Sequence, residues 1–136
     1  MNFHNKTYQI RISDINYGNH LGHDKLISIV HDARCSFFDS IGTSELHINE
    51  DQMGLVVHEV NFKYKSQIHF LDKIEVLSYF TEISDYTVKM NSEIKNIKQN
   101  KMSAVGYIKL VCFNFKNNKI SKFPKEFVEK LQEFSH

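Results

Sequence analysis

The hydrophobic pattern of the chain changes its period between residues 41 and 55, and this change limits the folds that are open to it. Residues 25–41 carry apolar side chains at spacings of three and four, which predicts one amphipathic helix. From residue 55 onward, apolar and polar residues alternate in four successive runs, which predicts strands. No helical pattern separates these runs, so the crossovers that parallel pairing requires are missing. The strands are therefore expected to form an antiparallel sheet.

Short segments flank this central pattern. Residues 8–13 alternate in the same way and predict a half-buried strand ahead of the helix. Gly42 marks the expected end of the helix. Pro124 suits the first position of a second, short helix over residues 124–134. This order of elements predicts an α+β fold in which the long helix lies on a curved antiparallel sheet.

The individual runs predict different positions in the sheet. Residues 55–70 have one mainly apolar face, which predicts a long strand with one buried side. Residues 102–115 are apolar on both faces, so they are expected to form a central strand. A turn is expected at residues 71–73.

The composition is that of an ordinary globular protein. Its 136 residues fit one domain, residues 1–136, and 17 basic against 16 acidic residues favour neither nucleic acid nor a membrane surface. Cys35 and Cys112 form no CxxC motif, so we expect free thiols. The N-terminal residues lack the apolar core of a signal peptide, and no apolar run is long enough to span a bilayer. A cytoplasmic protein is therefore expected.

The densest group of polar side chains lies just ahead of the long helix. Residues 11–24 hold two carboxylates, two imidazoles, two carboxamides and two glycines in a turn-prone segment. The first N–H groups of a helix have no partner within the helix. A polar segment at this position can therefore place free backbone donors and acid/base side chains around one substrate atom. This segment is the candidate active site.

The segment and the predicted fold together resemble the hotdog-fold thioesterases, in the branch of the 4-hydroxybenzoyl-CoA thioesterase and the acyl-CoA or acyl-carrier-protein thioesterases. That branch carries the pattern Ser-Asp-x-Asp-x-x-x-His-x-Asn-Asn, followed by Glu-Ala-Arg within the helix. Residues 13–23 read Ser-Asp-Ile-Asn-Tyr-Gly-Asn-His-Leu-Gly-His, and residues 32–34 read Asp-Ala-Arg. The resemblance covers nearly the whole chain, and residues 11–34 are its diagnostic part.

The chain departs from the family pattern at three places. Asn16 stands where many members have the catalytic Asp, and an amide cannot act as a general base. Gly22 and His23 replace an Asn pair, and Leu71 replaces the Gly of a later turn. Either the carboxylate role has moved to another residue or hydrolysis is weak.

The resemblance implies a hotdog fold and an acyl-CoA thioesterase that works as a two-fold dimer or a dimer of dimers. Water attacks the thioester carbonyl, and the N–H groups at the start of the helix hold the oxyanion. The expected partners are a coenzyme A thioester and a second copy of the chain, with no nucleic acid, membrane or cofactor. The alternatives are an acyl-carrier-protein thioesterase and a non-catalytic acyl-thioester binding protein, which Asn16 favours.

The resemblance also assigns catalytic roles to four residues. Asp32 is the expected base or nucleophile, because it matches the acidic residue of Glu-Ala-Arg; the alternative is a solvated carboxylate paired with a Lys or Arg. Asn16 orients the water or donates to the thioester oxygen, or else forms an Asx turn. His20 fixes the loop or bonds the substrate, or else bonds a backbone carbonyl. The N–H of His23 is the expected oxyanion donor.

Four further residues are expected to contact the substrate: Asp14, Tyr17, Gly22 and Asp24. Gly22 suits a close approach of the substrate to the backbone. Asp14 has a structural alternative, in which it bonds loop amides or pairs with Arg34, whose charge needs a partner beside the apolar stripe.

Histidine nitrogens and aspartate oxygens in this region are possible metal ligands. The residues concerned are His20, His23, His31, Asp24 and Asp32. Their spacing is not that of a helical zinc motif, and positions in a turn and a helix need not converge. We therefore expect no metal. Serine catalysis lacks its Gly-x-Ser-x-Gly elbow, and no phosphate-binding glycine loop or dinucleotide fingerprint occurs.

Overall fold

A computed structural model of the chain describes residues 2–49 and 52–136. Within these residues, six antiparallel strands form one sheet of order β1-β3-β4-β5-β2, with β6 paired to β5. The strands are β1 (His4–Gln9), β2 (Met53–Tyr64), β3 (Lys73–Thr81), β4 (Thr87–Asn96), β5 (Lys101–Asn114) and β6 (Lys119–Ile120). The helices are the 3-10 turn η1 (Ile12–Asp14), α1 (His23–Ser40) and α2 (Lys125–Gln132).

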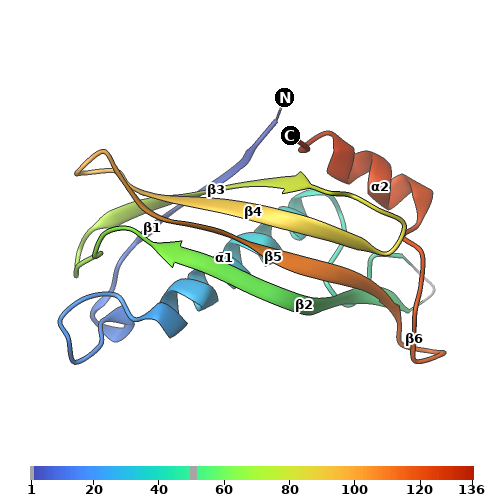
Figure 1. The fold of residues 1–136 in the computed structure, drawn as a ribbon, viewed down its shortest axis with the longest axis horizontal. Helices are drawn as coiled ribbons and strands as arrows, with labels where there is room; N and C mark the ends of the chain where they lie inside the picture. Colours follow the sequence, from blue (N-terminus) through green and yellow to red (C-terminus); the bar gives the residue numbers. More distant parts are fainter. Residues whose placement is uncertain (1, 50–51) are drawn as a thin grey trace.

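The curved sheet wraps around α1, which crosses behind the strands in Figure 1, while α2 lies at one end of the sheet. β3, β4 and β5 pair in chain order, and β2 occupies the outer edge beside β5. This is the expected α+β hotdog architecture, so the predicted fold class is confirmed. None of the helices in the described part of the chain is long and apolar enough to cross a membrane.

The hydrophobic core lies between α1 and the sheet. Leu26, Val30, Ala33 and Phe37 of α1 are buried, at the spacings of three and four that predict an amphipathic helix. The ring of Phe37 packs against that of Phe80 in β3, with their centroids 5.0 Å apart. This packing fixes the direction of α1, and therefore the position of its N-terminal end.

The structure differs from the sequence prediction at β1 and β2. The predicted strand at residues 8–13 is in fact β1, which ends at Gln9, and Ile12 lies exposed in η1. β2 ends at Tyr64, well short of residue 70, and most of its residues after Leu55 are exposed. Val56 and Val57, which point to opposite faces, are both exposed, and a bulge after Val57 also shifts the register of β2 against β5.

Two residues with positive φ shape the turns. Gly42 has a φ of 80° and follows the last turn of α1, as predicted for a helix end. Leu71 has a φ of 70° in the turn before β3, at the position where the resembling family has Gly. Its N–H donates to the carbonyl oxygen of Ile10 at 3.1 Å, which joins this turn to the end of β1. A left-handed backbone costs an L residue about 1 kcal/mol.

Candidate active site

A cavity of about 350 Å³ opens at the N-terminal end of α1. The loop before α1 contributes Asn16 and His20, and the first helical position contributes His23. The opposite wall includes Tyr64 at the end of β2 and Ser103 in β5. Three of the four residues expected to be catalytic therefore line one cavity, which has the size of an ordinary small-molecule site.

Backbone hydrogen bonds hold the loop ahead of α1 against the sheet. The N–H of Asn16 donates to the carbonyl oxygen of His20 at 3.0 Å, which closes the loop on itself. The N–H of Leu21 donates to the carbonyl oxygen of Ile68 at 2.7 Å, which joins the loop to the segment after β2. These bonds position the two polar side chains of the loop at the cavity wall.

Asn16 combines its expected structural role with a free donor. Its Oδ1 accepts a hydrogen bond from the N–H of Gly18 at 2.9 Å, which is the Asx turn considered for this residue. Among the described residues, its Nδ2 has no hydrogen-bond partner. A Cβ added at Gly22, the residue before α1, would lie 3.8 Å from this Nδ2. The amide nitrogen of Asn16 is therefore a donor beside the start of the helix.

The imidazole of His20 is oriented by a backbone carbonyl. Its Nδ1 lies 3.1 Å from the carbonyl oxygen of Leu21. In the neutral ring with the proton on Nδ1, that nitrogen donates to the carbonyl, and Nε2 keeps a lone pair that can accept a proton. A Cβ at position 18 would lie 3.2 Å from Nε2, so Gly18 leaves space at this nitrogen.

The first turn of α1 offers free backbone donors. Gly22 is the residue before the helix and has no side chain to cap it, and the first helical hydrogen bond runs from the N–H of Leu26 to Gly22 at 3.0 Å. Within the described part of the chain, the N–H groups of His23 and Asp24 bond no acceptor. Such donors, at the positive end of the helix dipole, suit a developing negative charge.

Asp32 lies elsewhere on α1, in a separate depression that it shares with Tyr8 and Asp14. Its Oδ2 lies 2.8 Å from Nζ of Lys6 and also accepts a hydrogen bond from the hydroxyl of Tyr8. These two hydrogen bonds hold the pKa of Asp32 below its ordinary value. Burial and the bond to Asp32 raise the pKa of Tyr8. The structure therefore does not bring Asp32 together with the other expected catalytic residues in one chain.

The residues expected to contact the substrate are dispersed. Gly22 lies beside Asn16 at the start of the helix. The side chain of Tyr17 is fully exposed, and Asp24 is also exposed. In a single chain, Gly22 and Asp24 of these three adjoin the cavity residues, because a Cβ added at Gly22 would lie 2.6 Å from Oδ1 of Asp24 and the charge of Asp24 acts on Tyr64.

Asp14 bonds the loop, as its structural alternative proposed. Its Oδ2 accepts a hydrogen bond from the N–H of Arg11 at 2.9 Å. The alternative pairing with Arg34 is wrong, because Nε of Arg34 lies 2.5 Å from Oε1 of Glu45. Arg34 is only 4% exposed, so the predicted need for a partner is correct, but the partner comes from the segment after α1.

The sequence pattern does not identify three of the cavity residues, Tyr64, Ser66 and Ser103. The hydroxyl of Tyr64 donates to the carbonyl oxygen of His23 at 3.3 Å, and burial, followed by the charge of Asp24, raises the pKa of Tyr64. The hydroxyl of Ser66 donates to that of Ser103 at 3.0 Å. These residues face the helix because β2 ends at Tyr64. The alternation of apolar and polar residues does not show where this strand ends.

Several solved structures share this fold. The 1,4-dihydroxy-2-naphthoyl-CoA thioesterase from Synechocystis matches with a TM-score of 0.88 at 16% identity, covering 99% of each chain. The DHNA-CoA thioesterase from Staphylococcus aureus matches with a TM-score of 0.84 at 19% identity, covering 98% of this chain and 93% of that one. The protein SAV2348 from Staphylococcus aureus, solved in complex with CoA, has a TM-score of 0.89 at 16% identity, covering 98% and 84%. At these identities the likeness establishes the fold.

No curated protein matches the sequence. The model of a family described as the thioesterase-like superfamily matches residues 10–131, which include the loop before α1, the whole of α1 and strands β2 to β6; β1 lies ahead of the match. This match confirms the resemblance found in the sequence and the expected class of enzyme, a thioesterase. The chain belongs to the thioesterase-like superfamily.

Proposed function

We propose that this chain hydrolyses acyl-CoA thioesters in the cavity at the start of α1. The main support is that Asn16, His20 and the free N–H groups of the first helical turn adjoin one cavity. Two neighbours of the same fold are described as acting on CoA thioesters, and a third was solved with CoA, which favours coenzyme A as the thiol carrier.

The oxyanion is stabilised at the start of the helix. As water adds to the carbonyl carbon, negative charge develops on the thioester oxygen. The N–H groups of His23 and Asp24, together with Nδ2 of Asn16, donate to that oxygen. Because these donors are fixed before reaction, they need little reorganisation, and the loss of one such donor typically lowers the rate on the order of 10²–10³-fold.

His20 is the base in this proposal. Its Nε2 takes a proton from the attacking water while the new carbon–oxygen bond forms, and the bond at Nδ1 to the carbonyl of Leu21 keeps the ring in position. When the carbon–sulfur bond breaks, the same proton passes to the leaving sulfur, giving the free thiol and the carboxylic acid. Asp32 remains the alternative prediction for the base, and its pairing with Lys6 argues against that role in a single chain.

Thiol release from a panel of acyl-CoA thioesters, measured with a thiol reagent, tests this function. We expect His20→Gln to lower kcat on the order of 10²-fold or more, while Asp32→Asn keeps most of the activity. His47→Gln, the same change at an exposed histidine, is the matched control. The reverse result for His20 and Asp32 would assign the base to Asp32.

A non-catalytic acyl-thioester binding protein is the second candidate, because Asn16 replaces the carboxylate of the family pattern. Calorimetric binding of acyl-CoA by the wild type, without thiol release from any thioester of the panel, would establish that function and reject the hydrolase. Thiol release from acyl-carrier-protein thioesters alone would instead identify acyl-carrier protein as the thiol carrier and leave the proposed hydrolysis unchanged.

The outer edge of β2 is the proposed contact with a second copy of the chain. Among the described residues this edge pairs with no other strand, and Val56, Val57 and Val60 on β2 are 41%, 44% and 47% exposed. An apolar free edge is a template for pairing, so a two-fold dimer, alone or as a dimer of dimers, would cover it. Light scattering should give a dimer or tetramer mass for the wild type and a monomer mass for Val57→Lys.

The free thiols Cys35 and Cys112 support a reducing cytoplasm as the compartment.

A further inference from the structure

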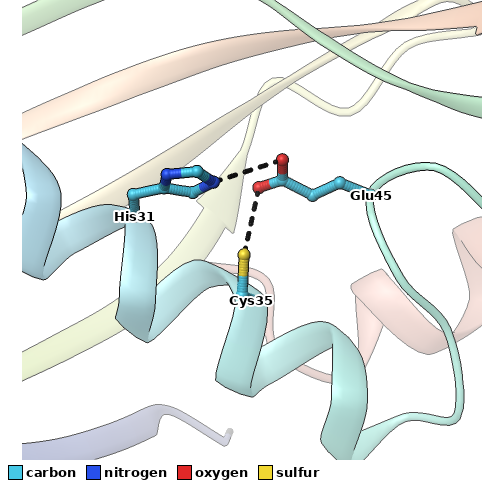
Figure 2. Close-up of side chains that lie close together, drawn as sticks. All are labelled: His31, Cys35 and Glu45. Carbon is cyan, nitrogen blue, oxygen red and sulfur yellow. Dashed lines mark hydrogen bonds and ion pairs between the residues drawn. The ribbon is translucent and has the colours of Figure 1, made fainter.

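His31, Cys35 and Glu45 form a cluster of potential metal ligands outside the cavity (Figure 2). His31 and Cys35 lie one turn apart on α1, so their side chains leave the same face of the helix. Glu45 comes from the segment after α1, and Figure 2 shows the imidazole facing one oxygen of its carboxylate and the thiol facing the other. The ligand atoms of all three residues lie within 4.8 Å of one another.

The spacing of His31 and Glu45 fits a tetrahedral ion. Nε2 of His31 lies 3.4 Å from Oε2 of Glu45, while Sγ of Cys35 lies 3.7 Å from the other oxygen, Oε1, which also contacts Arg34. With ordinary zinc–ligand bond lengths, two ligand atoms of a tetrahedral site are about 3.3–3.6 Å apart. Nε2 of His31 and Oε2 of Glu45 are already at such a separation, and Sγ of Cys35, which lies within 4.8 Å of the ligand atoms of both residues, must turn toward them to reach the same ion.

A buried residue holds the carboxylate in place. Nε of Arg34 lies 2.5 Å from Oε1 of Glu45, and the side chain of Arg34 is 4% exposed. This contact leaves Oε2 directed to His31, and ligands that are oriented by such hydrogen bonds bind metals more tightly. The cluster is therefore more than a chance meeting of mobile surface side chains.

The donor set selects the kind of metal. A cysteine sulfur and an imidazole nitrogen favour Zn²⁺ over Mg²⁺ or Ca²⁺, which prefer oxygen ligands. Three protein ligands leave the fourth position of a tetrahedral ion to water. Of the histidines considered from the sequence as metal ligands, only His31 belongs to this cluster, because His20 and His23 line the cavity instead.

We propose that His31, Cys35 and Glu45 bind one Zn²⁺ ion and that this ion ties the segment after α1 to the middle of the helix. Cys35 coordinates as the thiolate, so its proton is released to solvent when the metal binds. In the metal-free chain, burial and the charge of Glu45 raise the pKa of this thiol. The two negative ligands then balance the charge of the ion, and Arg34 keeps its contact with the other oxygen of Glu45.

Cobalt is a direct probe of this site, because a thiolate bound to Co²⁺ gives a charge-transfer absorption band. The full chain is freed of metal with a chelator and titrated with Co²⁺, and Zn²⁺ is then added to displace it. We expect the thiolate band to saturate at one equivalent and to disappear on addition of Zn²⁺. Cys35→Ser should lose the band, and His31→Gln should weaken Co²⁺ binding by more than about tenfold.

Matched variants exclude the other thiol and nonspecific histidine binding. Cys112→Ala removes the second free cysteine, and His47→Gln removes an exposed histidine outside the cluster; both should titrate like the wild type. Zn²⁺ should also raise the Tm of the wild type. It should leave unchanged the Tm of the double variant that carries both His31→Gln and Cys35→Ser. Absence of a thiolate band in folded wild type, or equal Zn²⁺ affinity in the wild type and this double variant, would overturn the proposal. Neither result depends on thioesterase activity.

Discussion

The hydroxyl of Tyr64 donates a hydrogen bond to the carbonyl oxygen of His23, at a distance of 3.3 Å, and so ties the end of β2 to the first turn of α1. The same turn carries the free N–H groups proposed to hold the oxyanion. Among the described residues, β2 is also one of the two edge strands of the sheet. The edge proposed to contact a second copy is therefore linked, through one tyrosine, to the wall of the candidate active site.

Tyr64→Phe should lower kcat by about fivefold or less, because one hydrogen bond contributes about 1 kcal/mol and Tyr64 is half exposed. Steady-state thiol release measures this change. Tyr107→Phe is the matched control, since its hydroxyl donates to Glu59 at 3.0 Å on the same sheet and does not adjoin the cavity. Equal kcat values for the two variants would show that the contact between Tyr64 and His23 has no part in positioning the helix end.

Two glycines should separate catalysis from stability. A methyl group at Gly18 would lie 3.2 Å from Nε2 of His20, so Gly18→Ala should obstruct the proposed base and lower kcat by about tenfold or more, with little change in Tm. Gly42 has a φ of 80° and open space around its Cα, so Gly42→Ala should leave kcat unchanged and destabilise the fold by about 1 kcal/mol. Kinetics and thermal melts on both variants are needed. A Gly18→Ala enzyme with full activity would argue against His20 as the base.

Leu71→Gly should stabilise the protein. Leu71 holds a φ of 70° and is 58% exposed, so glycine relieves the backbone strain and removes little buried surface. We expect a gain of about 1 kcal/mol, seen as a Tm higher by roughly 3–5 °C. Leu46→Gly changes another leucine, 60% exposed, whose φ is not positive, and it should lower the Tm. A Tm for Leu71→Gly at or below that of the wild type would show that the backbone of Leu71 is not strained.

The sequence predicts the parts of the site that depend on neighbouring residues. Asn16 and His20 belong to one short loop, and the helix that begins at His23 follows directly. These three residues line one cavity because they are close in the sequence. The face of α1 that enters the core is equally local, because spacings of three and four alone decide it. These are the features that the sequence and the structure share.

The position of Asp32 depends on distant parts of the chain, and the sequence pattern carries no signal for it. Helical spacing places Asp32 on the polar side of α1, but Lys6 and Tyr8 of β1 are the residues that this side meets. Glu45 likewise reaches His31 and Cys35 through the fold of the segment after α1. Which strand or loop covers a given helix face is decided by packing of the whole domain, and periodicity cannot supply it.

The pH dependence of stability should include a contribution from His4. Its Nδ1 is buried with no hydrogen-bond partner among the described residues, and its ring packs against that of Phe37 with centroids 5.5 Å apart. Burial, and then the charge of Lys6, hold the pKa of His4 below its ordinary value of 6.5. The unfolded chain therefore takes up a proton at a higher pH than the folded chain. The free energy of unfolding should fall as the pH drops below about 6.5, until the folded pKa is passed.

His4→Gln removes this titration and should flatten the dependence of stability on pH between 7.5 and 5.5, in urea unfolding at several pH values. The quantity compared is the slope of the free energy of unfolding against pH, because a change in packing at position 4 shifts the stability equally at every pH. His47→Gln, at an exposed position, should keep the slope of the wild type. If His4→Gln and the wild type lose the same stability over this range, the imidazole of His4 is not held neutral by the fold, and the acid sensitivity belongs to other groups.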